Sequence, residues 1–444
     1  MKRYKDYRDS SVEWIGCIPK GWQCVALKHV STIQNGSTPS SSEDKYWDGD
    51  VNWVTTDDLG KLKDRLIVNT RRTITKEGYE SCGTRMASKG SVVISTRAPI
   101  GHIGILDIQA CTNQGCKTVI PTAINNVYCY YFLKHARPFL ESLGEGSTFK
   151  ELPTGTLKSF YIPVPTIEEQ TQIAQYLDHK TTQIDKLITD KEKLIELLNE
   201  ERTAIINQSV TKGLNPDGPM KDSGVEWIGK IPNHWELKRL KFIGSAFGGL
   251  TYAPNNVVEE NEGTLVLRSS NIQNGELSLK DNVYVNSKIP VKLTLKRGDI
   301  LICSRNGSKN LIGKNICIDK DMEGSTFGAF MMIFRSPNWK FLKHYFNSSI
   351  FTSQSALFLT ATINQLTTST LNNFWIALPN SSTEQNEISR FIDDKNREID
   401  LIKKNAQQEI RLLKEYKTAL ISEVVTGKVD VRDEVIAEST ELVS

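Results

Sequence analysis

The chain has 444 residues, of which 39% are hydrophobic and 24% charged, and its formal net charge is +3. This length is too great for one ordinary hydrophobic core and predicts two or three domains. The mean hydropathy is −0.35. No run of about 18 apolar residues occurs, which excludes a membrane-spanning helix. The charged first residues lack the apolar stretch of a secretory signal, so we expect a globular protein of the cytoplasm.

The net charge is unevenly distributed along the chain. Residues 1–166 and 214–380 each carry +5, whereas 167–213 carries −3 and 381–428 is neutral. Residues 429–444 hold one basic and five acidic side chains, which predicts an acidic C-terminal tail. Basic surface attracts phosphate groups, so contact with a polyanion is expected in the two basic segments, although many ordinary domains carry a similar charge.

The eight cysteines and six histidines show no metal-site spacing. Cys111 and Cys116 are the nearest pair of cysteines, and neither a second pair nor a histidine cluster accompanies them. We therefore expect reduced thiols and no bound metal in this chain.

Most of the chain forms an internal sequence repeat, in which the same motifs recur in the same order. DSSVEWIGCIPKGWQCVALKHV at 9–30 returns at 222–243 as DSGVEWIGKIPNHWELKRLKFI, with two tryptophans, a proline and a glycine in register. Such self-similarity indicates two structural repeats. The other paired segments are 51–59 with 264–272, 89–104 with 297–313, 148–165 with 362–379, 169–188 with 384–403, and 202–213 with 417–428.

The segments 1–165 and 214–379 each predict an α+β domain. Short runs of β-branched residues at Ser91–Thr96 and Asp299–Ser304 are bounded by glycine and predict buried strands. Glycine, serine, asparagine and proline punctuate the rest of both segments, as is typical of turns between short elements.

The segments 166–213 and 380–428 each predict one long helix. Proline and a polar capping residue precede both, and no glycine or proline follows before Gly213 and Gly427. Apolar residues recur with heptad spacing, which predicts an antiparallel coiled coil; the alternative is that each helix lies alone on its own domain. The predicted seam residues are Ile173, Leu177, Ile184, Leu187, Leu194, Leu198 and Ile205 in the first helix, and Ile388, Ile392, Ile399, Ile402, Ala406, Leu413 and Leu420 in the second.

Taken together, these segments resemble the specificity subunits of type I restriction–modification systems. The resemblance is carried by Asp-Ser-Gly-Val-Glu-Trp-Ile-Gly-Lys-Ile-Pro at 222–232, its copy at 9–19, the Glu-Gln-x-x-Ile pattern that opens both helices, and Thr-Gly-Lys-Val-Asp-Val-Arg at 426–432. It covers the whole chain in order. It implies two target recognition domains separated by two long helices, which set the spacing between two halves of a split site in double-stranded DNA.

The resemblance also implies partner subunits that carry the chemistry. Two methylation subunits that use S-adenosylmethionine would modify adenine at N6, and restriction subunits would use ATP and Mg²⁺. This chain would hold no cofactor and catalyse nothing. It contains no Asn-Pro-Pro-Tyr or Asp-Pro-Pro-Tyr motif and no phosphate-binding loop, which agrees with that role.

Two other functions are weighed against this interpretation. An enzyme with its own nuclease or methylase activity would need a motif of the kind that is missing. A coiled-coil scaffold for proteins, without sequence-specific DNA binding, would leave the two divergent basic segments unexplained. Because the recognition domains differ inside their shared framing motifs, we expect an asymmetric DNA target.

The candidate DNA-contacting residues lie where predicted strands enter loops. Arg97 and Arg305 end matching strands, and an arginine there can bind guanine or phosphate; the alternative is a pair with an internal carboxylate. Short polar residues in the other loops can meet base edges or merely cap turns. The candidates are Gly36, Ser37, Thr38, Thr55, Thr56, Asp57 and Arg97 in the first domain, and Arg268, Ser269, Asn271, Arg305 and Asn306 in the second.

Overall fold

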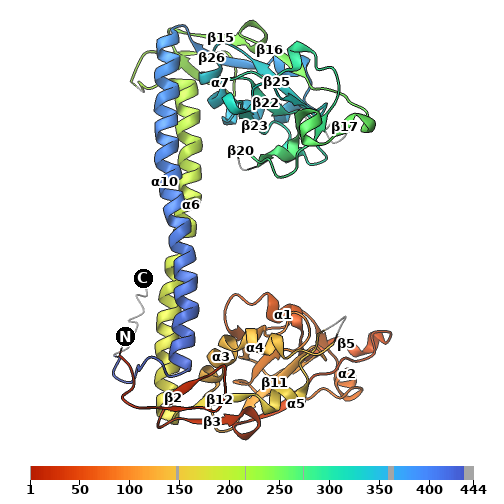
Figure 1. Cartoon of the computed structure of the whole chain (residues 1–444), viewed down its shortest axis with the longest axis vertical. Coiled ribbons are helices and arrows are strands. Elements are labelled where there is room, and N and C mark those ends of the chain that lie inside the picture. Colours follow the sequence, from red (N-terminus) through yellow and green to blue (C-terminus); the bar gives the residue numbers. More distant parts are fainter. Residues whose placement is uncertain (1, 147–149, 216, 274, 359–364, 435–444) are drawn as a thin grey trace. The chain divides into compact units, whose positions relative to one another are not determined.

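The computed structural model describes residues 2–434 except 147–149, 216, 274 and 359–364. The chain forms two compact units, the first of residues 1–191 and 408–444 and the second of residues 192–407. Each unit contains one α+β domain and part of both long helices (Figure 1). The border between the units therefore lies within the helices.

The first unit is built around a five-stranded sheet of order β4-β11-β8-β9-β6. Its central strand, β8, is buried at all four positions, as its run of valine and isoleucine predicted. The strands are β1 (Tyr7–Asp9), β2 (Cys17–Pro19), β3 (Gln23–Ala26), β4 (Ser31–Asn35), β5 (Trp47–Val54), β6 (Leu66–Ile67), β7 (Thr73–Ile74), β8 (Val92–Ser95), β9 (Ile103–Leu106), β10 (Cys111–Thr112), β11 (Cys116–Pro121) and β12 (Tyr161–Val164). The short helices are α1 (Thr56–Gly60), α2 (Lys76–Glu80), α3 (Asn126–His135), α4 (Arg137–Ser142) and α5 (Thr154–Ser159).

The second unit repeats this plan with a four-stranded sheet of order β16-β25-β22-β23. Its strand β22 is also buried at all four positions, which confirms the second predicted core strand. The strands are β13 (Met220–Asp222), β14 (Lys230–Pro232), β15 (Trp235–Arg239), β16 (Ser245–Gly248), β17 (Val257–Val258), β18 (Thr264–Leu267), β19 (Ile272–Gln273), β20 (Glu276–Leu277), β21 (Tyr284–Val285), β22 (Ile300–Cys303), β23 (Asn315–Cys317), β24 (Thr326–Phe327), β25 (Met331–Arg335) and β26 (Trp375–Pro379). The short helices are α7 (Trp339–Tyr345), α8 (Ser349–Phe358) and α9 (Thr368–Asn372).

The pairing of strands confirms the internal repeat. In the first unit β11 lies antiparallel between β4 and β8, and in the second β25 lies antiparallel between β16 and β22. A parallel pair joins β10 to β5, and its counterpart joins β24 to β18. Because equivalent strands pair in the same way in both domains, the loops that follow these strands can be compared residue by residue.

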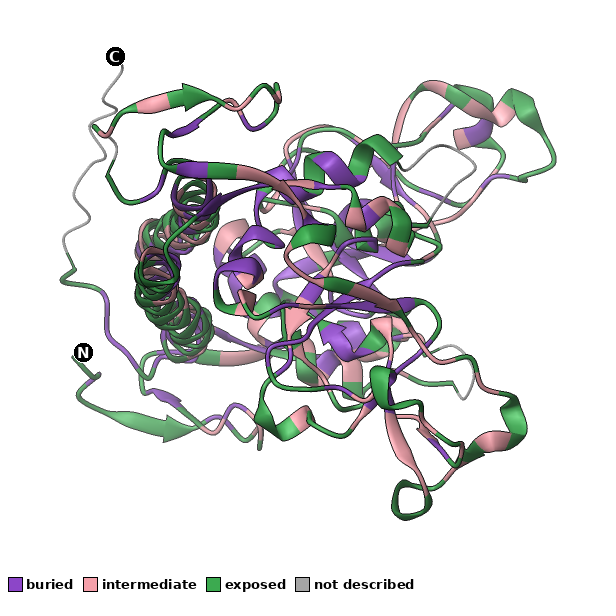
Figure 2. Ribbon diagram, turned by 90° about the horizontal axis from the view of Figure 1, so that it is seen from above, coloured by how far each residue is buried: buried purple, intermediate pink, exposed green. Residues whose placement is uncertain are grey.

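The two long helices are α6 (Ile167–Lys212) and α10 (Ser382–Val425), close to their predicted bounds. They run antiparallel in both units: Asp185 pairs with Lys417 at 2.6 Å in the first, and Lys403 donates to Asn199 at 2.7 Å in the second. Figure 2 looks along these helices and shows that much of their outer surface is exposed. The antiparallel coiled coil is therefore confirmed within each unit.

Most of the predicted seam residues are buried or half-buried, but three are exposed. Leu187, Leu194 and Ile402 are 49%, 39% and 44% exposed. The buried residues Leu177, Thr181, Ile184 and Ile188 of α6 follow one another in steps of four, three and four residues, so the buried stripe passes beside Leu187 and not through it. The seam residues confirmed as buried are Ile173, Leu177, Ile184, Leu198, Ile388, Ile392, Ile399, Ala406 and Leu420, while Ile205 and Leu413 are half-buried.

Each domain is attached to a long helix by an aspartate at the same place in the repeat. Asp178 of α6 accepts a hydrogen bond of 2.8 Å from Tyr131 and pairs with Arg65. Asp393 of α10 pairs with Lys343 at 2.7 Å, and the Nε2 atom of the buried His344 lies 3.3 Å from it. The helices are thus joined to their domains by ion pairs as well as by apolar packing.

Candidate nucleic-acid interface

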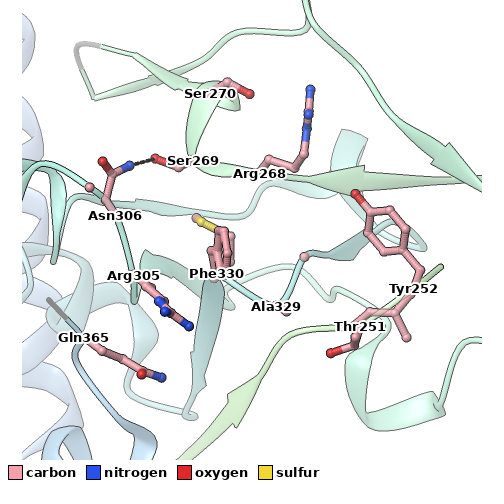
Figure 3. A pocket seen from close by; sticks show the side chains of 14 residues that line it. Thr251, Tyr252, Arg268, Ser269, Ser270, Arg305, Asn306, Ala329, Phe330 and Gln365 are labelled. Atoms are coloured by element: carbon pink, nitrogen blue, oxygen red, sulfur yellow. Dashed lines mark hydrogen bonds between the residues drawn. The ribbon is translucent and has the colours of Figure 1, made fainter. Parts of the chain in front are cut away.

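A hollow of about 1130 Å³ opens where several strands of the second domain end (Figure 3). Arg268 to Ser270 follow β18, Arg305 to Gly307 follow β22, and Gly328 to Met331 lead into β25. The tertiary structure therefore gathers four of the predicted candidates, Arg268, Ser269, Arg305 and Asn306, around one hollow. Its other lining residues are Leu250, Thr251, Tyr252 and Gln365.

Arg305 is the exposed cation of this hollow. Its backbone N–H donates to the carbonyl of Phe330 at 3.1 Å, and its guanidinium carbon lies 5.4 Å from the centroid of the Phe330 ring. The ring itself is 58% exposed, which is unusual for a phenylalanine. A guanidinium over an aromatic face keeps all its N–H donors for a further partner. Figure 3 shows the Arg305 and Phe330 side chains next to each other.

Asn306 and Arg268 are held by their neighbours. The Asn306 side-chain amide donates to Ser269 Oγ at 3.2 Å, the contact drawn in Figure 3. Arg268 pairs with Asp281 at 2.7 Å and also donates to its backbone carbonyl at 3.0 Å. These bonds orient polar groups at the rim of the hollow before any ligand is present, which lowers the entropic cost of binding.

Asn271 lies in the core of a turn. It is fully buried, its Oδ1 accepts the backbone N–H of Arg268 at 2.8 Å, and its Nδ2 donates to the Ser278 carbonyl at 2.9 Å. The matching turn of the first domain has Thr55 and Asp58, which form a capping box at the start of α1. The structure therefore uses Asn271 and Thr55 as turn caps, the alternative that sequence reasoning left open.

Thr56 and Asp57 follow the Thr55 cap on α1. Thr56 is half-buried and Asp57 is exposed. Asp57 pairs with Lys61 at 2.8 Å and with Arg71. These two basic partners and Asp57 form an exposed charged group beside the loop that follows β5.

The loop at Gly36 is shaped by a close backbone approach. A Cβ atom on Gly36 would lie 1.9 Å from the Asn113 carbonyl oxygen, and one on the matching Gly249 would lie 2.0 Å from that of Gly328. Only glycine fits at both positions. The next residues are partly buried: Ser37 accepts a hydrogen bond of 3.0 Å from the Trp53 indole through its carbonyl, and Thr38 contacts the Gln114 side chain.

Arg97 occupies the backbone position of Arg305 but has a different neighbour. Its N–H donates to the Gly115 carbonyl at 3.3 Å, so glycine stands where the second domain has Phe330. The Arg97 Nε donates to Glu151 Oε2 at 2.9 Å, and the other carboxylate oxygen lies 3.7 Å from Lys117 Nζ. The pairing with a carboxylate, which sequence reasoning weighed as the alternative, is thus present.

Lys117 is a buried amine behind this pair, with 5% of its side chain exposed. It donates to Thr96 Oγ1 at 3.1 Å and to the Leu152 carbonyl at 2.9 Å. Burial lowers the pKa of Lys117, and the carboxylate of Glu151 opposes that shift. The strand β25 of the second domain carries Met332 at the corresponding place, so the second domain lacks this buried cation.

Sequence reasoning missed Phe330, Gln365, Glu151 and Lys117. These residues differ between the two repeats, so the comparison of copies that revealed Arg97 and Arg305 could not reveal them. The sequence repeat aligns Glu151 with Gln365, but only the folded chain shows that their backbones bridge to Arg97 and Arg305.

Neither a metal-binding cluster nor a membrane helix is found in the described part of the chain. No group of three or more histidine, cysteine, aspartate or glutamate side chains suited to a metal occurs among the described residues. No helix among them is both long and apolar enough to cross a membrane.

Comparison with known proteins identifies the family. The family model described as "Type I restriction modification DNA specificity domain" matches residues 19–197 and 232–412, one match in each repeat. The MjaIX specificity subunit of Methanocaldococcus jannaschii is 32% identical over 283 residues, covering 60% of this chain and 64% of that protein. The MjaVIII specificity subunit of the same organism is 24% identical, covering 94% and 95%. The matched region thus spans just under two-thirds of the first of these relatives.

Two solved structures share the fold. One, from a study titled "Structural basis underlying complex assembly and conformational transition of the type I R-M system", has a TM-score of 0.67 at 14% identity and covers 93% of this chain and 99% of that one. The HsdS subunit from Thermoanaerobacter tengcongensis has a TM-score of 0.57 at 15% identity and covers 93% and 98%. With both repeats matched by the same family model, the chain belongs to the family of type I restriction–modification DNA specificity proteins.

Proposed function

We propose that this chain is the DNA sequence-recognition subunit of a type I restriction–modification complex, and that each α+β domain reads one half of an asymmetric, bipartite target. The observation that carries the proposal is that the same loops meet in both domains and carry different side chains there. Arg305 lies against Phe330, whereas Arg97 is bonded to Glu151. A common scaffold with different contact residues is what two unlike half-sites require.

The proposed contact residues are those that face outward from this scaffold. In the second domain the Arg305 guanidinium makes no hydrogen bond to another described residue, so its N–H donors can meet base edges, and Ser269 and Asn306 line the same hollow. In the first domain Arg97 remains 45% exposed although it is paired. The remaining candidates there are Ser37, Thr38, Thr56 and Asp57, while Gly36, Thr55 and Asn271 support the loops from within.

We further propose that the two long helices set the distance between the half-sites and dock the methylation subunits. The supporting observation is that α6 and α10 are continuous over 46 and 44 residues and take part in both units. At about 1.5 Å per residue, α6 is about 69 Å long. Helices of fixed length hold two readers in fixed register on a duplex, as in other bipartite DNA-binding proteins.

The partners of this proposal carry the chemistry. Two methylation subunits would bind S-adenosylmethionine and modify adenine at N6, and restriction subunits would use ATP and Mg²⁺, with the complex acting in the cytoplasm. The family is that of the specificity subunit, and the chain's own contribution is recognition rather than catalysis.

The test is genome-wide mapping of N6-methyladenine in the host with and without this gene. We expect methylation at one bipartite, asymmetric motif to disappear when the gene is deleted. The complex reconstituted with its methylation subunits should then prefer a duplex with that motif over one with scrambled half-sites. A complex that assembles but binds both duplexes equally would contradict the proposal and favour a protein scaffold without sequence-specific DNA binding.

A further inference from the structure

The matching arginines of the two domains are held by different chemical groups. In the second domain the neighbour of Arg305 is the Phe330 ring, and the bridging residue is the neutral Gln365. In the first domain the residue at the Phe330 position is Gly115, and the bridging residue is the acidic Glu151. The second domain thus has an aromatic ring beside its arginine, and the first domain has a carboxylate instead.

Space explains why the first domain does not use a ring. A Cβ atom on Gly115 would lie 2.9 Å from the Thr56 methyl group, closer than real Cβ contacts, so α1 leaves little room for a larger side chain there. Arg97 therefore needs another group to hold it. An unrestrained arginine would lose its rotamer freedom on binding, which weakens both affinity and discrimination.

Glu151 is placed to orient Arg97 without covering its binding edge. Its hydrogen bond of 2.9 Å goes to the Arg97 Nε. The two terminal Nη groups form the fork that fits the O6 and N7 atoms of guanine, and this bond does not use them. Nearly half of the Arg97 side chain, 45%, stays exposed.

Lys117 in turn holds Glu151 from the buried side. Its two hydrogen bonds to Thr96 and Leu152 fix the ammonium, and Glu151 Oε1 lies 3.7 Å from it. A buried ammonium without a counter-charge is costly, so Lys117 and Glu151 depend on each other. The second domain replaces both, with Met332 and Gln365 at the two places.

We infer, building on the proposed function, that Glu151 is a positioning residue for sequence reading: fixed by Lys117, it orients Arg97 toward a guanine in the first half-site, as the Phe330 ring orients Arg305 toward a guanine in the second. The ligand of both sites is thus the major-groove edge of a G·C pair. The same arginine–guanine contact is thus oriented by an ion pair in the first domain and by an aromatic ring in the second.

The experiment uses the complex reconstituted with its methylation subunits and duplexes in which one base pair of the target is changed at a time. The half-site read by each domain is first assigned with Arg97→Ala and Arg305→Ala. The double variant Glu151→Gln with Lys117→Met copies the residues of the second domain and leaves no buried charge unpaired. We expect it to lower discrimination for guanine at one position of the first half-site by about tenfold, part of the factor that a bidentate arginine contact supplies.

The matched control is Phe330→Ala, which should lower guanine discrimination at one position of the second half-site and leave the first unchanged. Glu151→Asp keeps the charge and should retain more discrimination than the double variant. Thermal melting of each variant checks that the fold is kept, because a purely structural role would lower the melting temperature without affecting one base position selectively.

Two results would overturn the inference. One is a first half-site in which no guanine is required at the position that Arg97→Ala relaxes. The other is a double variant that discriminates as the unmodified protein does, or that weakens both half-sites equally. Failure of the proposed function itself gives a different result, because the unmodified complex would then show no preference for any split sequence.

Discussion

Arg97 and Arg305 have the same backbone hydrogen bond but different surroundings. Arg305 lies 5.4 Å from an aromatic centroid in an open hollow, whereas Arg97 is bonded to Glu151. A bidentate arginine–guanine contact is worth about 1–3 kcal/mol of discrimination. Under the proposed function, each arginine should therefore contribute strongly to sequence preference, and its effect should be confined to the half-site read by its own domain.

We expect Arg305→Ala to lower discrimination at one position of one half-site by about tenfold, and Arg97→Ala to do the same at the other half-site only. Binding of the reconstituted complex to duplexes with single base-pair changes measures both effects. Lys309, exposed in the loop after Arg305, provides the control. Lys309→Ala should leave base preference unchanged, and an Arg305→Ala variant that affected both half-sites equally would contradict the division of labour.

We expect His344 to make the stability of the second unit depend on pH. Burial lowers the pKa of His344 below its ordinary value of 6.5, although the Asp393 carboxylate 3.3 Å from its Nε2 acts in the opposite direction. A histidine with a lowered pKa in the folded state binds its proton more readily when unfolded, so its stabilising effect is complete above pH 6.5 and declines as the pH falls below it. Burial favours a raised pKa for Asp393, but the nearby His344 and the hydrogen bonds from Lys343 bring it to about 2, so the carboxylate stays charged through that range.

The corresponding prediction concerns His344→Gln. The melting temperature of the unmodified protein should fall between pH 7.5 and pH 5.5. The melting temperature of the variant should fall less, because glutamine does not titrate. Thermal melting across this pH range measures the difference. His29→Gln, at an exposed position, is the control and should keep the pH dependence of the unmodified protein. Identical pH dependence for His344→Gln would contradict the role of the buried imidazole.

At the scale of elements, both long helices end on a glycine packed against a proline-containing hairpin. Gly213 follows α6 with a φ of +72°, and Gly427 follows α10 with a φ of +73°. A Cβ atom on Gly427 would lie 2.4 Å from Pro19 Cδ, whereas one on Gly213 would lie 3.3 Å from Trp235. The two helix ends are therefore alike in backbone conformation but differ in the space around them.

We expect Gly213→Ala to cost about 1–2 kcal/mol of stability through backbone strain alone. Gly427→Ala should cost more, because Pro19 or the hairpin that carries it must also move. Hydrogen exchange of the amides in β1–β2 and β13–β14 measures the two losses separately. Equal losses at the two sites would show that the contact with Pro19 relaxes freely.

The polar residues of the coiled coil also follow the repeat. Asp185 with Lys417 and Asp400 with Arg202 are cross-helix pairs related by an offset of 215 residues. Lys191 pairs with Glu409 without such a counterpart. Half-buried ion pairs contribute little to net stability but disfavour other registers, because a shifted helix would leave the charges unpaired. These pairs therefore specify one antiparallel register.

At the scale of the whole molecule, the proposed spacing role predicts the result of a matched deletion. Residues 189–195 and 406–412 are one heptad from each helix, and together they contain both members of the Lys191–Glu409 pair. Their removal keeps the heptad pattern and shortens the coiled coil by about 10 Å. With about 3.4 Å per base pair, the gap between the half-sites should shorten by about three base pairs while their sequences stay the same.

Methylation mapping of a host that carries the deletion variant measures this gap. Deleting only 189–195 is the control, since it shifts α6 against α10, breaks the remaining cross-helix pairs and should abolish specific methylation. A matched deletion that kept the original gap would exclude the helices as the element that sets the spacing.

Much of this organisation was predictable from particular residues. The repeated Glu-Trp-Ile-Gly motif, the buried runs at β8 and β22, and the absence of glycine and proline through both helices led directly to two α+β domains and an antiparallel coiled coil. The seam was harder to predict, because Leu194 and Ile195 are both apolar neighbours and only the partner helix decides which one it covers. The roles of Thr55 and Asn271 as caps were likewise open, since the same polar side chains suit turns and base edges.

By itself the sequence determined the repeat, the fold class of its parts and the matching positions of Arg97 and Arg305, because periodicity and self-similarity are local properties of the chain. Only the tertiary structure decided what surrounds those arginines. Glu151 lies 54 residues from Arg97 along the chain and Phe330 lies 25 residues from Arg305, and neither is repeated in the other domain. Such contacts depend on which strand ends meet, and that is set by packing over the whole domain rather than by any local pattern.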